Sequence, residues 1–198
     1  MTKDPWPPAI ELQGAAVRLV PLAPVHADEL REAVKDGELW KLWFTSVPAP
    51  KDIEEEIARR LKLRAAGSML PFTVLVRGKA IGMTTYMNID AANRRLEIGS
   101  TWYARSCQKT AVNTQCKRLL LAYAFETLDC IAVEFRTHFF NRESRRAIER
   151  LGAKLDGVLR SHSIGRGGEL RDTCVYSIIA SEWPAVKTNL DWRLSTRG

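Results

Sequence analysis

The chain has 198 residues, 45% of them hydrophobic, with a formal net charge of +7 and a pI near 9.4. This length and apolar content suit a single globular domain over residues 1–198, and the lack of any long apolar run excludes a predicted membrane span. The positive charge is compatible either with general affinity for polyanions or with a local basic site for a phosphorylated ligand.

The first part of the chain is predicted to hold one strand and two helices. Residues 17–21 are mostly apolar and indicate a strand, and Pro24 can begin a helix as its first residue. A second helix is expected over residues 51–66, and Gly67 ends it. Apolar residues recur at helical spacing in both helices, at Leu30, Ala33 and Val34 in the first and at Ile53, Ile57 and Leu61 in the second.

The rest of the chain alternates between strands and helices, so the predicted fold class is α+β. A hairpin turn at residues 77–79 separates the first two of these strands. In chain order, the predicted elements are strands at 72–76, 80–89 and 96–103, a helix at 112–127, a strand at 131–137, a helix from about 141 to 151, and strands at 158–163 and 173–179.

The cysteines show no pattern of a metal site or a disulfide framework. They are Cys107, Cys116, Cys130 and Cys174, without C-x-x-C spacing or a nearby histidine, so we expect no metal. A chain of this size needs no disulfides, and its amino terminus lacks the apolar run of a signal peptide. We therefore expect a cytoplasmic protein.

A polar loop, residues 108–114, joins the strand at 96–103 to the helix at 112–127. At the start of a helix, free backbone N–H groups and the positive end of the helix dipole attract phosphate. Asn113 and Thr114 are predicted to cap this helix, and the small Ala111 lets a diphosphate approach the backbone. Because many helices with polar first turns bind no ligand, the loop alone does not establish a site.

Basic residues flank this loop. Their position favours a phosphate-rich small ligand over a polyanion, although solvated basic helix faces would produce the same pattern. The residues concerned are Lys109, Lys117 and Arg118 around the loop and Arg142, Arg145, Arg146 and Arg150 in the next helix.

Taken together, the order of strand, polar loop, helix, strand, Asn141-x-x-Ser144 helix and Leu151-Gly-Ala153 resembles the GNAT superfamily of acetyl-CoA-dependent N-acetyltransferases. Within it, the chain is most similar to the Rim-type ribosomal-protein N-terminal acetyltransferases, over about residues 15–180. The resemblance implies the GNAT fold. In that fold a mixed, mostly antiparallel sheet of about seven strands is flanked by helices, and a splayed strand pair holds coenzyme A.

The loop departs from the family pattern, Gln/Arg-x-x-Gly-x-Gly/Ala, at its two small positions, which are Ala111 and Asn113 here. Alanine does not tolerate a positive φ, and asparagine adds bulk near the phosphates, although it can donate a hydrogen bond. Lys109 and Thr110 can offset this with a charge and a hydroxyl. We therefore expect the loop to bind coenzyme A with altered geometry or affinity.

The resemblance assigns acetyl-CoA or coenzyme A to the slot between the strands at 96–103 and 131–137. The pantetheine arm would pair with backbone groups near the end of the first strand, and the diphosphate would rest on the loop. Asn141 would hydrogen-bond the arm, although an ordinary helix N-cap explains it equally well. The implied cofactor-binding residues are Trp102, Tyr103, Gln108, Lys109, Thr110, Ala111, Val112, Asn113, Thr114, Asn141, Ser144 and Arg145.

Three residues are candidates for catalysis. A lysine-like amine is mostly protonated at neutral pH, so a general base is useful. The resemblance places Glu97 where histone-type members carry their base, and Glu134 where a Rim-type member carries its glutamate. Ser144 is the remaining proton donor for the leaving sulfur, because Ile148 occupies the position at which many members have an acidic tyrosine. A solvent-exposed position is the alternative explanation for each candidate.

The acceptor site is expected near Trp40 and Trp43, between the first two helices, because the resemblance places the acceptor pocket there. Large aromatic side chains can attract a cation, but they suit a core or dimer contact equally well. His162, on a late strand, is expected to face the same pocket and is a further candidate base. A protein N-terminus, a polyamine, an amino-acid derivative and a drug amine all remain open as the acceptor.

Two other functions also remain open. A nucleic-acid-binding module would explain the charge, but the basic residues lack interleaved aromatics or a helix-turn-helix. A coenzyme-A-binding regulator or a degenerate enzyme is suggested by Ala111, Asn113 and Ile148. We expect an acetyl-CoA-dependent N-acetyltransferase acting on an amine, without a nucleic-acid or membrane partner. The resemblance adds a homodimer, which nothing in the sequence requires.

Overall fold

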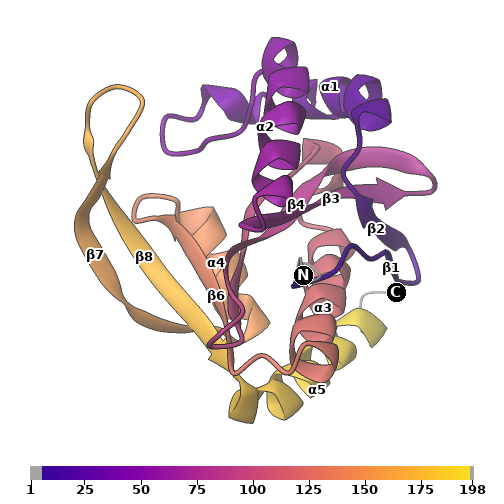
Figure 1. Ribbon diagram of the computed structural model, residues 1–198, viewed down its shortest axis with the longest axis vertical. Helices are drawn as coiled ribbons and strands as arrows, with labels where there is room; N and C mark the ends of the chain where they lie inside the picture. Colours follow the sequence, from indigo (N-terminus) through magenta and orange to yellow (C-terminus); the bar gives the residue numbers. More distant parts are fainter. Residues whose placement is uncertain (1–5, 197–198) are drawn as a thin grey trace.

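The computed structural model describes residues 6–196, which are built on one eight-stranded sheet (Figure 1). The strands are ordered β1-β2-β3-β4-β5-β6-β8-β7, and every neighbouring pair is antiparallel except β5 and β6. Their bounds are β1 Leu12–Gln13, β2 Val17–Pro21, β3 Met69–Val76, β4 Lys79–Asp90, β5 Arg95–Tyr103, β6 Ala132–His138, β7 Lys154–Ile164 and β8 Leu170–Ile179.

Helices cover both faces of this sheet (Figure 1). They are α1 Ala27–Lys35, α2 Ile53–Ala65, α3 Val112–Ala122, α4 Arg142–Leu151 and α5 Trp183–Ser195. α1 and α2 bury their apolar side chains with Met83 and Trp102 on one face, whereas α3, α4 and α5 cover a larger core around Tyr86 and Tyr176 on the other. Over residues 6–196, none of the helices has the length and apolarity that crossing a bilayer would require.

The structure confirms the α+β class and the predicted order of the main elements, with two additions. β1 is a strand of only two residues, too short to leave a pattern in the sequence. α5 is absent from the predicted elements, because the exposed Trp192 lies among its apolar residues and obscures the buried stripe. The helix predicted over 112–127 is shorter than expected: α3 ends at Ala122, and one π-helical turn, Tyr123–Thr127, follows it.

β5 and β6 separate part-way along their length. They pair in parallel only where residues 95–97 face residues 132–134. Beyond that point β5 runs on to Tyr103 and β6 to His138 without pairing to each other. The predicted splayed strand pair is therefore present, and among the residues that the structure describes the edge of β5 that faces β6 meets no strand over residues 98–103.

A bulge re-aims β5 within this splayed region. Ser100 has a φ of 48°, and the register between β4 and β5 shifts at the same level. Arg60 of α2, only 2% exposed, donates hydrogen bonds to the Ser100 carbonyl at 3.3 Å and to the Thr85 hydroxyl at 2.7 Å. Its Nε lies 2.6 Å from Glu56 Oε1. Helix α2 thus holds the bulge through the hydrogen bonds of Arg60 to Ser100, and Glu56 of the same helix neutralises the buried guanidinium.

Candidate active site

The free edge of β5 forms one wall of the expected cofactor slot. The side chains of Trp102 and Tyr103 are buried in the two apolar clusters on opposite faces of the sheet. Neighbouring residues of a strand point to opposite faces, so these two residues can meet a ligand at the strand edge only through their backbone groups. Both residues therefore lie beside the expected slot, and their role in binding coenzyme A stays a prediction.

The loop at residues 108–114 presents a row of unpaired backbone amides. Within residues 6–196, five of its N–H groups donate to no protein acceptor: those of Lys109, Thr110, Ala111, Asn113 and Thr114. They surround the start of α3, where the helix dipole is positive. This arrangement suits the two phosphates of a diphosphate, and it is the feature of the chain that best fits coenzyme A.

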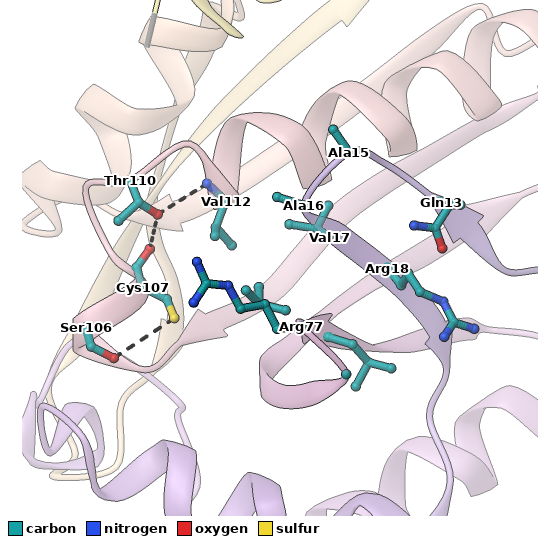
Figure 2. A pocket seen from close by; sticks show the side chains of 13 residues that line it. Gln13, Ala15, Ala16, Val17, Arg18, Arg77, Ser106, Cys107, Thr110 and Val112 are labelled. Atoms are coloured by element: carbon teal, nitrogen blue, oxygen red, sulfur yellow. Dashed lines mark hydrogen bonds between the residues drawn. The ribbon is translucent and has the colours of Figure 1, made fainter. Parts of the chain in front are cut away.

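The loop backbone accommodates its non-glycine residues. Ala111 has a φ of −68°, the right-handed region that alanine prefers, and Lys109 takes the left-handed position at a φ of 60°. The predicted caps Asn113 and Thr114 are wrong, because both lie inside the first turn of α3. Instead, the Thr110 hydroxyl accepts the Val112 amide at 3.3 Å (Figure 2). Its own hydrogen goes to the Cys107 carbonyl at 2.7 Å.

A cavity of about 730 Å³ lies beside the same loop, and Figure 2 shows the side chains that line it. Val112 and Cys107 border it on one side, and Arg18 of β2 and Arg77 of the β3–β4 turn border it on the other. In the sheet, β2 and β3 lie on the side of β5 away from β6. This cavity is therefore separate from the splayed edge that the cofactor is expected to follow.

The first turn of α4 lies across from the loop. Lys109 Nζ is 3.9 Å from Glu143 Oε1, and both side chains are exposed. Asn141 is the N-cap of α4, and its side-chain oxygen accepts the Ser144 N–H at 3.0 Å. Within the described part of the chain the Ser144 hydroxyl makes no hydrogen bond. The structure therefore brings the predicted residues of α4 and of the loop to the same place.

Two predicted cofactor residues have side chains that protein groups already hold. Arg145 Nε donates to the Tyr176 hydroxyl at 3.0 Å, and its guanidinium lies 5.0 Å from the centre of the Phe139 ring. Gln108 Nε2 donates to the Tyr103 carbonyl at 3.0 Å. Gln108 would have to weaken this contact in order to bind a phosphate, whereas Arg145 keeps Nη2 without a protein partner within residues 6–196.

Glu97 is a buried carboxylate at the base of the splayed region, with 5% of its surface exposed. It accepts a hydrogen bond from Asn88 Nδ2 at 2.7 Å and lies 3.6 Å from Arg136 Nε. Burial raises the pKa of Glu97, and Asn88 and Arg136 offset only part of that rise. Gly99 leaves room for the carboxylate, because a Cβ at that position would meet Glu97 Oε1 at 2.7 Å.

Glu134, opposite Glu97 on β6, has a different environment. Arg95 Nη2 donates to it at 2.6 Å and Arg136 Nη2 at 3.0 Å. Burial alone would raise the pKa of Glu134, but hydrogen bonds from Arg136 and Arg95 hold it below its usual value. A doubly paired carboxylate is a weak proton acceptor. Of the two predicted bases, Glu134 is thus the one whose charged form two arginines stabilise directly.

A second cavity, of about 160 Å³, lies between the connection that joins α1 to α2 and the β7–β8 hairpin; we call it the acceptor-side cavity. In Figure 1 this connection extends toward the tall hairpin at the left of the molecule. The cavity is lined by residues 43–46, by His138 at the end of β6, and by residues 163–166, Glu169 and Arg171. Three segments far apart in the sequence therefore build it.

The predicted acceptor residues divide between this cavity and other places. Trp43 lines it, 55% exposed, and its ring lies 4.9 Å from that of His138. Trp40 instead packs against the core under α1 and α2. His162 is exposed on β7, where its Nδ1 lies 3.2 Å from the Thr173 hydroxyl. No sequence signal selects His138, because its neighbours in the cavity are remote in the chain.

A family model described as an acetyltransferase (GNAT) domain matches residues 16–154, which is most of the chain. The chain belongs to the GNAT acetyltransferase family. It is a family of acyltransferases that use acetyl-CoA. Membership therefore confirms the predicted class of enzyme and the predicted cofactor. Its members act on amines.

This GNAT protein is 32% identical over 172 residues to "Putative ribosomal N-acetyltransferase YdaF" of Bacillus subtilis (strain 168), covering 84% of this chain and 92% of that protein. The crystal structure of a GCN5-related N-acetyltransferase from Brucella melitensis matches with a TM-score of 0.83 at 31% identity, over 93% of this chain and 85% of that one. Mycobacterium smegmatis RimJ in complex with CoA-disulfide shares the fold, with a TM-score of 0.77 at 21% identity over 95% and 94%. The predicted Rim-like GNAT assignment is thereby confirmed.

Proposed function

We propose that this protein moves an acetyl group from acetyl-CoA to a primary amine, on a protein N-terminus or a small molecule, by direct attack of the amine on the thioester. The observation that carries the proposal is the position of Glu97. Its buried carboxylate lies where β5 and β6 stop pairing. It is also close enough to Arg171 of the acceptor-side cavity for the two charges to act on each other.

The residues of the slot fit the cofactor. Acetyl-CoA supplies the acetyl thioester, and the unpaired amides around residues 109–114 are the groups that would hold its diphosphate. The free edge of β5 offers backbone groups to the pantetheine arm, and Asn141 and Ser144 lie across from the loop. These contacts would fix the acetyl group in place, and orientation alone contributes several kcal/mol, up to about 7–11, to such reactions.

Glu97 would receive the proton of the amine, directly or through water. An amine attacks only in its neutral form, and a lysine-like amine has a pKa of about 10.4. A carboxylate whose pKa is raised by burial is a better proton acceptor near neutral pH than an ordinary glutamate. Glu134 is the second choice, since its two arginine partners stabilise its charged form.

Ser144 is the residue we propose as proton donor to the leaving thiolate. Its hydroxyl is half-buried at the start of α4 and makes no hydrogen bond within residues 6–196. Ile148, one turn further along the same helix, is buried in the core and offers no hydroxyl. A serine hydroxyl is a weak acid, so its contribution is expected to be a hydrogen bond rather than complete proton transfer.

The test has two stages. Calorimetric titration should show that acetyl-CoA binds in the micromolar range. When a broad panel of primary amines is then supplied as acceptors, the protein should release the free thiol of coenzyme A at a measurable rate with at least one of them. Binding without transfer to any amine in the panel would instead support a regulatory or catalytically degenerate protein. Failure to bind acetyl-CoA at millimolar concentration would overturn the proposal.

A further inference from the structure

Two residues that line the acceptor-side cavity each have a buried hydrogen-bond donor without a partner in the described part of the chain. His138 Nε2 and Arg171 Nε are both shielded, and neither meets an acceptor within residues 6–196. Both residues line the cavity. A buried donor that is left unpaired is unfavourable. Two such donors on residues that line one small cavity therefore point to a ligand that accepts hydrogen bonds from this pair of side chains.

The protonation of His138 follows from its other nitrogen. The Phe140 N–H donates to His138 Nδ1 at 3.1 Å, so the proton of the neutral ring is on Nε2. Burial lowers the pKa of His138, and the positive charge of Arg171 lowers it further. The ring is therefore a neutral N–H donor at neutral pH, and its edge-on contact with Trp43 fixes its plane.

Arg171 carries a positive charge that no carboxylate in the described part of the chain neutralises by direct contact. It forms no ion pair within 4.0 Å, unlike Arg95 and Arg136, which share Glu134. The charge of Glu97 acts on Arg171 from a distance, without a hydrogen bond. Glu169 also lines the cavity, but its carboxylate accepts the Gly167 N–H within the hairpin turn.

We propose that the amine acceptor carries a carboxylate, and that Arg171 and His138 hold this carboxylate in the acceptor-side cavity. A carboxylate accepts from a guanidinium and from an imidazole N–H at once, and it neutralises the unpaired positive charge. This inference rests on the proposed function, because it assigns the acceptor of the same reaction.

The size and walls of the cavity limit what else the acceptor contains. At about 160 Å³ it is smaller than the roughly 300–1,000 Å³ of sites that enclose a whole small ligand. It therefore takes one part of the acceptor, the carboxylate with the carbon atoms next to it. The rings of Trp43 and Phe44 would cover those carbon atoms. A free amino carboxylate and a peptide with an acidic first residue share this chemistry.

The kinetic test compares acceptors in which a neutral amide replaces the carboxylate. The peptide pair is Asp-Ala-Ala-amide and Asn-Ala-Ala-amide, and the small-molecule pair is β-alanine and β-alaninamide. With the unmodified protein, kcat/KM should favour the carboxylate of at least one pair by about 10- to 100-fold, the value of a hydrogen-bonded charge. Preference within the peptide pair alone, or within the small-molecule pair alone, identifies the source of the carboxylate.

Arg171→Gln should abolish this preference, and Arg171→Lys should restore part of it. Arg160→Gln is the matched control, because it removes one positive charge from the same hairpin, where Arg160 is 81% exposed and paired with Asp172 outside the cavity. The control should leave the preference unchanged. Loss of preference in Arg160→Gln as in Arg171→Gln would mean that overall charge, not the cavity, selects the acceptor, and would overturn the proposal.

A binding measurement is independent of turnover. Calorimetric titration with N-acetyl-aspartate α-amide and with N-acetyl-asparagine α-amide, of which only the first has a carboxylate, should show tighter binding of the carboxylate by about tenfold or more in the unmodified protein, and equal binding in Arg171→Gln. Equal affinity for both compounds in the unmodified protein, or no binding of either, overturns this inference. The proposed acetyl transfer would survive that result if acetyl-CoA binds and neutral amines are acetylated.

Discussion

The two halves of the site are built from different parts of the polypeptide. The proposed cofactor half consists mainly of backbone, a strand edge and a row of amides within residues 98–114, with the first turn of α4 across from them. The acceptor half consists of side chains from the α1–α2 connection, the end of β6 and the β7–β8 hairpin. Backbone groups are the same whatever the side chain, so the first half can stay constant while substitutions in the second change the acceptor.

The largest effect is expected from a substitution of Glu97, whose carboxylate lies between the cofactor half and the acceptor half. Glu97→Gln should lower kcat/KM by about 100-fold or more at neutral pH, the usual contribution of a general base. The dissociation constant of acetyl-CoA should not change, since no amide of the loop is touched. Steady-state kinetics and calorimetry on the same preparation check both statements. The matched variant Glu134→Gln should cost much less, and a larger loss there than at Glu97 would transfer the role of base to Glu134.

Acetyl-CoA binding by the cofactor half should depend on the charge of a side chain introduced into the loop more than on its size. Ala111→Glu places a carboxylate among the unpaired amides, where it competes with the diphosphate and repels it. Acetyl-CoA binding should weaken by about tenfold or more. Ala111→Gln, of nearly the same shape but neutral, should weaken it far less, because position 111 has the right-handed backbone that any residue adopts. Calorimetry distinguishes the two; similar losses would mean that bulk controls the loop.

The pH dependence of the reaction rate tests whether Glu97 is the base. A base works when deprotonated, so the rate should fall as the pH drops through the raised pKa of Glu97. Asn88 donates to the charged carboxylate and lowers that pKa, so Asn88→Gly should raise it further and move the acidic limb to higher pH by about half a unit to one unit. Glycine suits the φ of 47° at this position.

The profile of kcat/KM against pH measures this shift. Asn93→Gly, in the turn between β4 and β5, is the matched control, because Asn93 contacts Asp90 rather than Glu97. Its limb should coincide with that of the unmodified protein. A limb at the ordinary pKa of a glutamate, unmoved by Asn88→Gly, would exclude Glu97 as the titrating group.

The smallest expected effect on acetyl-CoA binding is that of Lys109, the charged side chain within the loop at residues 108–114. It is 86% exposed and lies 3.9 Å from Glu143, so its charge is screened by water and partly neutralised. Lys109→Ala should change the dissociation constant of acetyl-CoA by only about twofold to threefold. Glu143→Ala should change it by a similar factor in the opposite direction. A tenfold loss in Lys109→Ala would show that side chains also build this half.

The same division explains what the sequence could predict. The loop, β5 and Glu97 lie within one short stretch of the chain, so local pattern together with the family resemblance is enough to predict a cofactor half there. His138 and Arg171 become neighbours only when β6 and β8 pair, and Trp43 reaches them from a connection without regular secondary structure. Trp40, three residues away, turns into the core instead, a difference that local pattern does not contain.

Arg60 has a consequence for how the slot meets its ligand. Because a buried guanidinium holds the Ser100 carbonyl, the bulge in β5 is fixed when the chain folds rather than when the cofactor arrives. The entropic cost of shaping that edge is therefore borne by folding, and binding has little disorder left to remove there. Helix α2, on one face of the sheet, would therefore contribute to the cofactor affinity of the slot at the edge of β5.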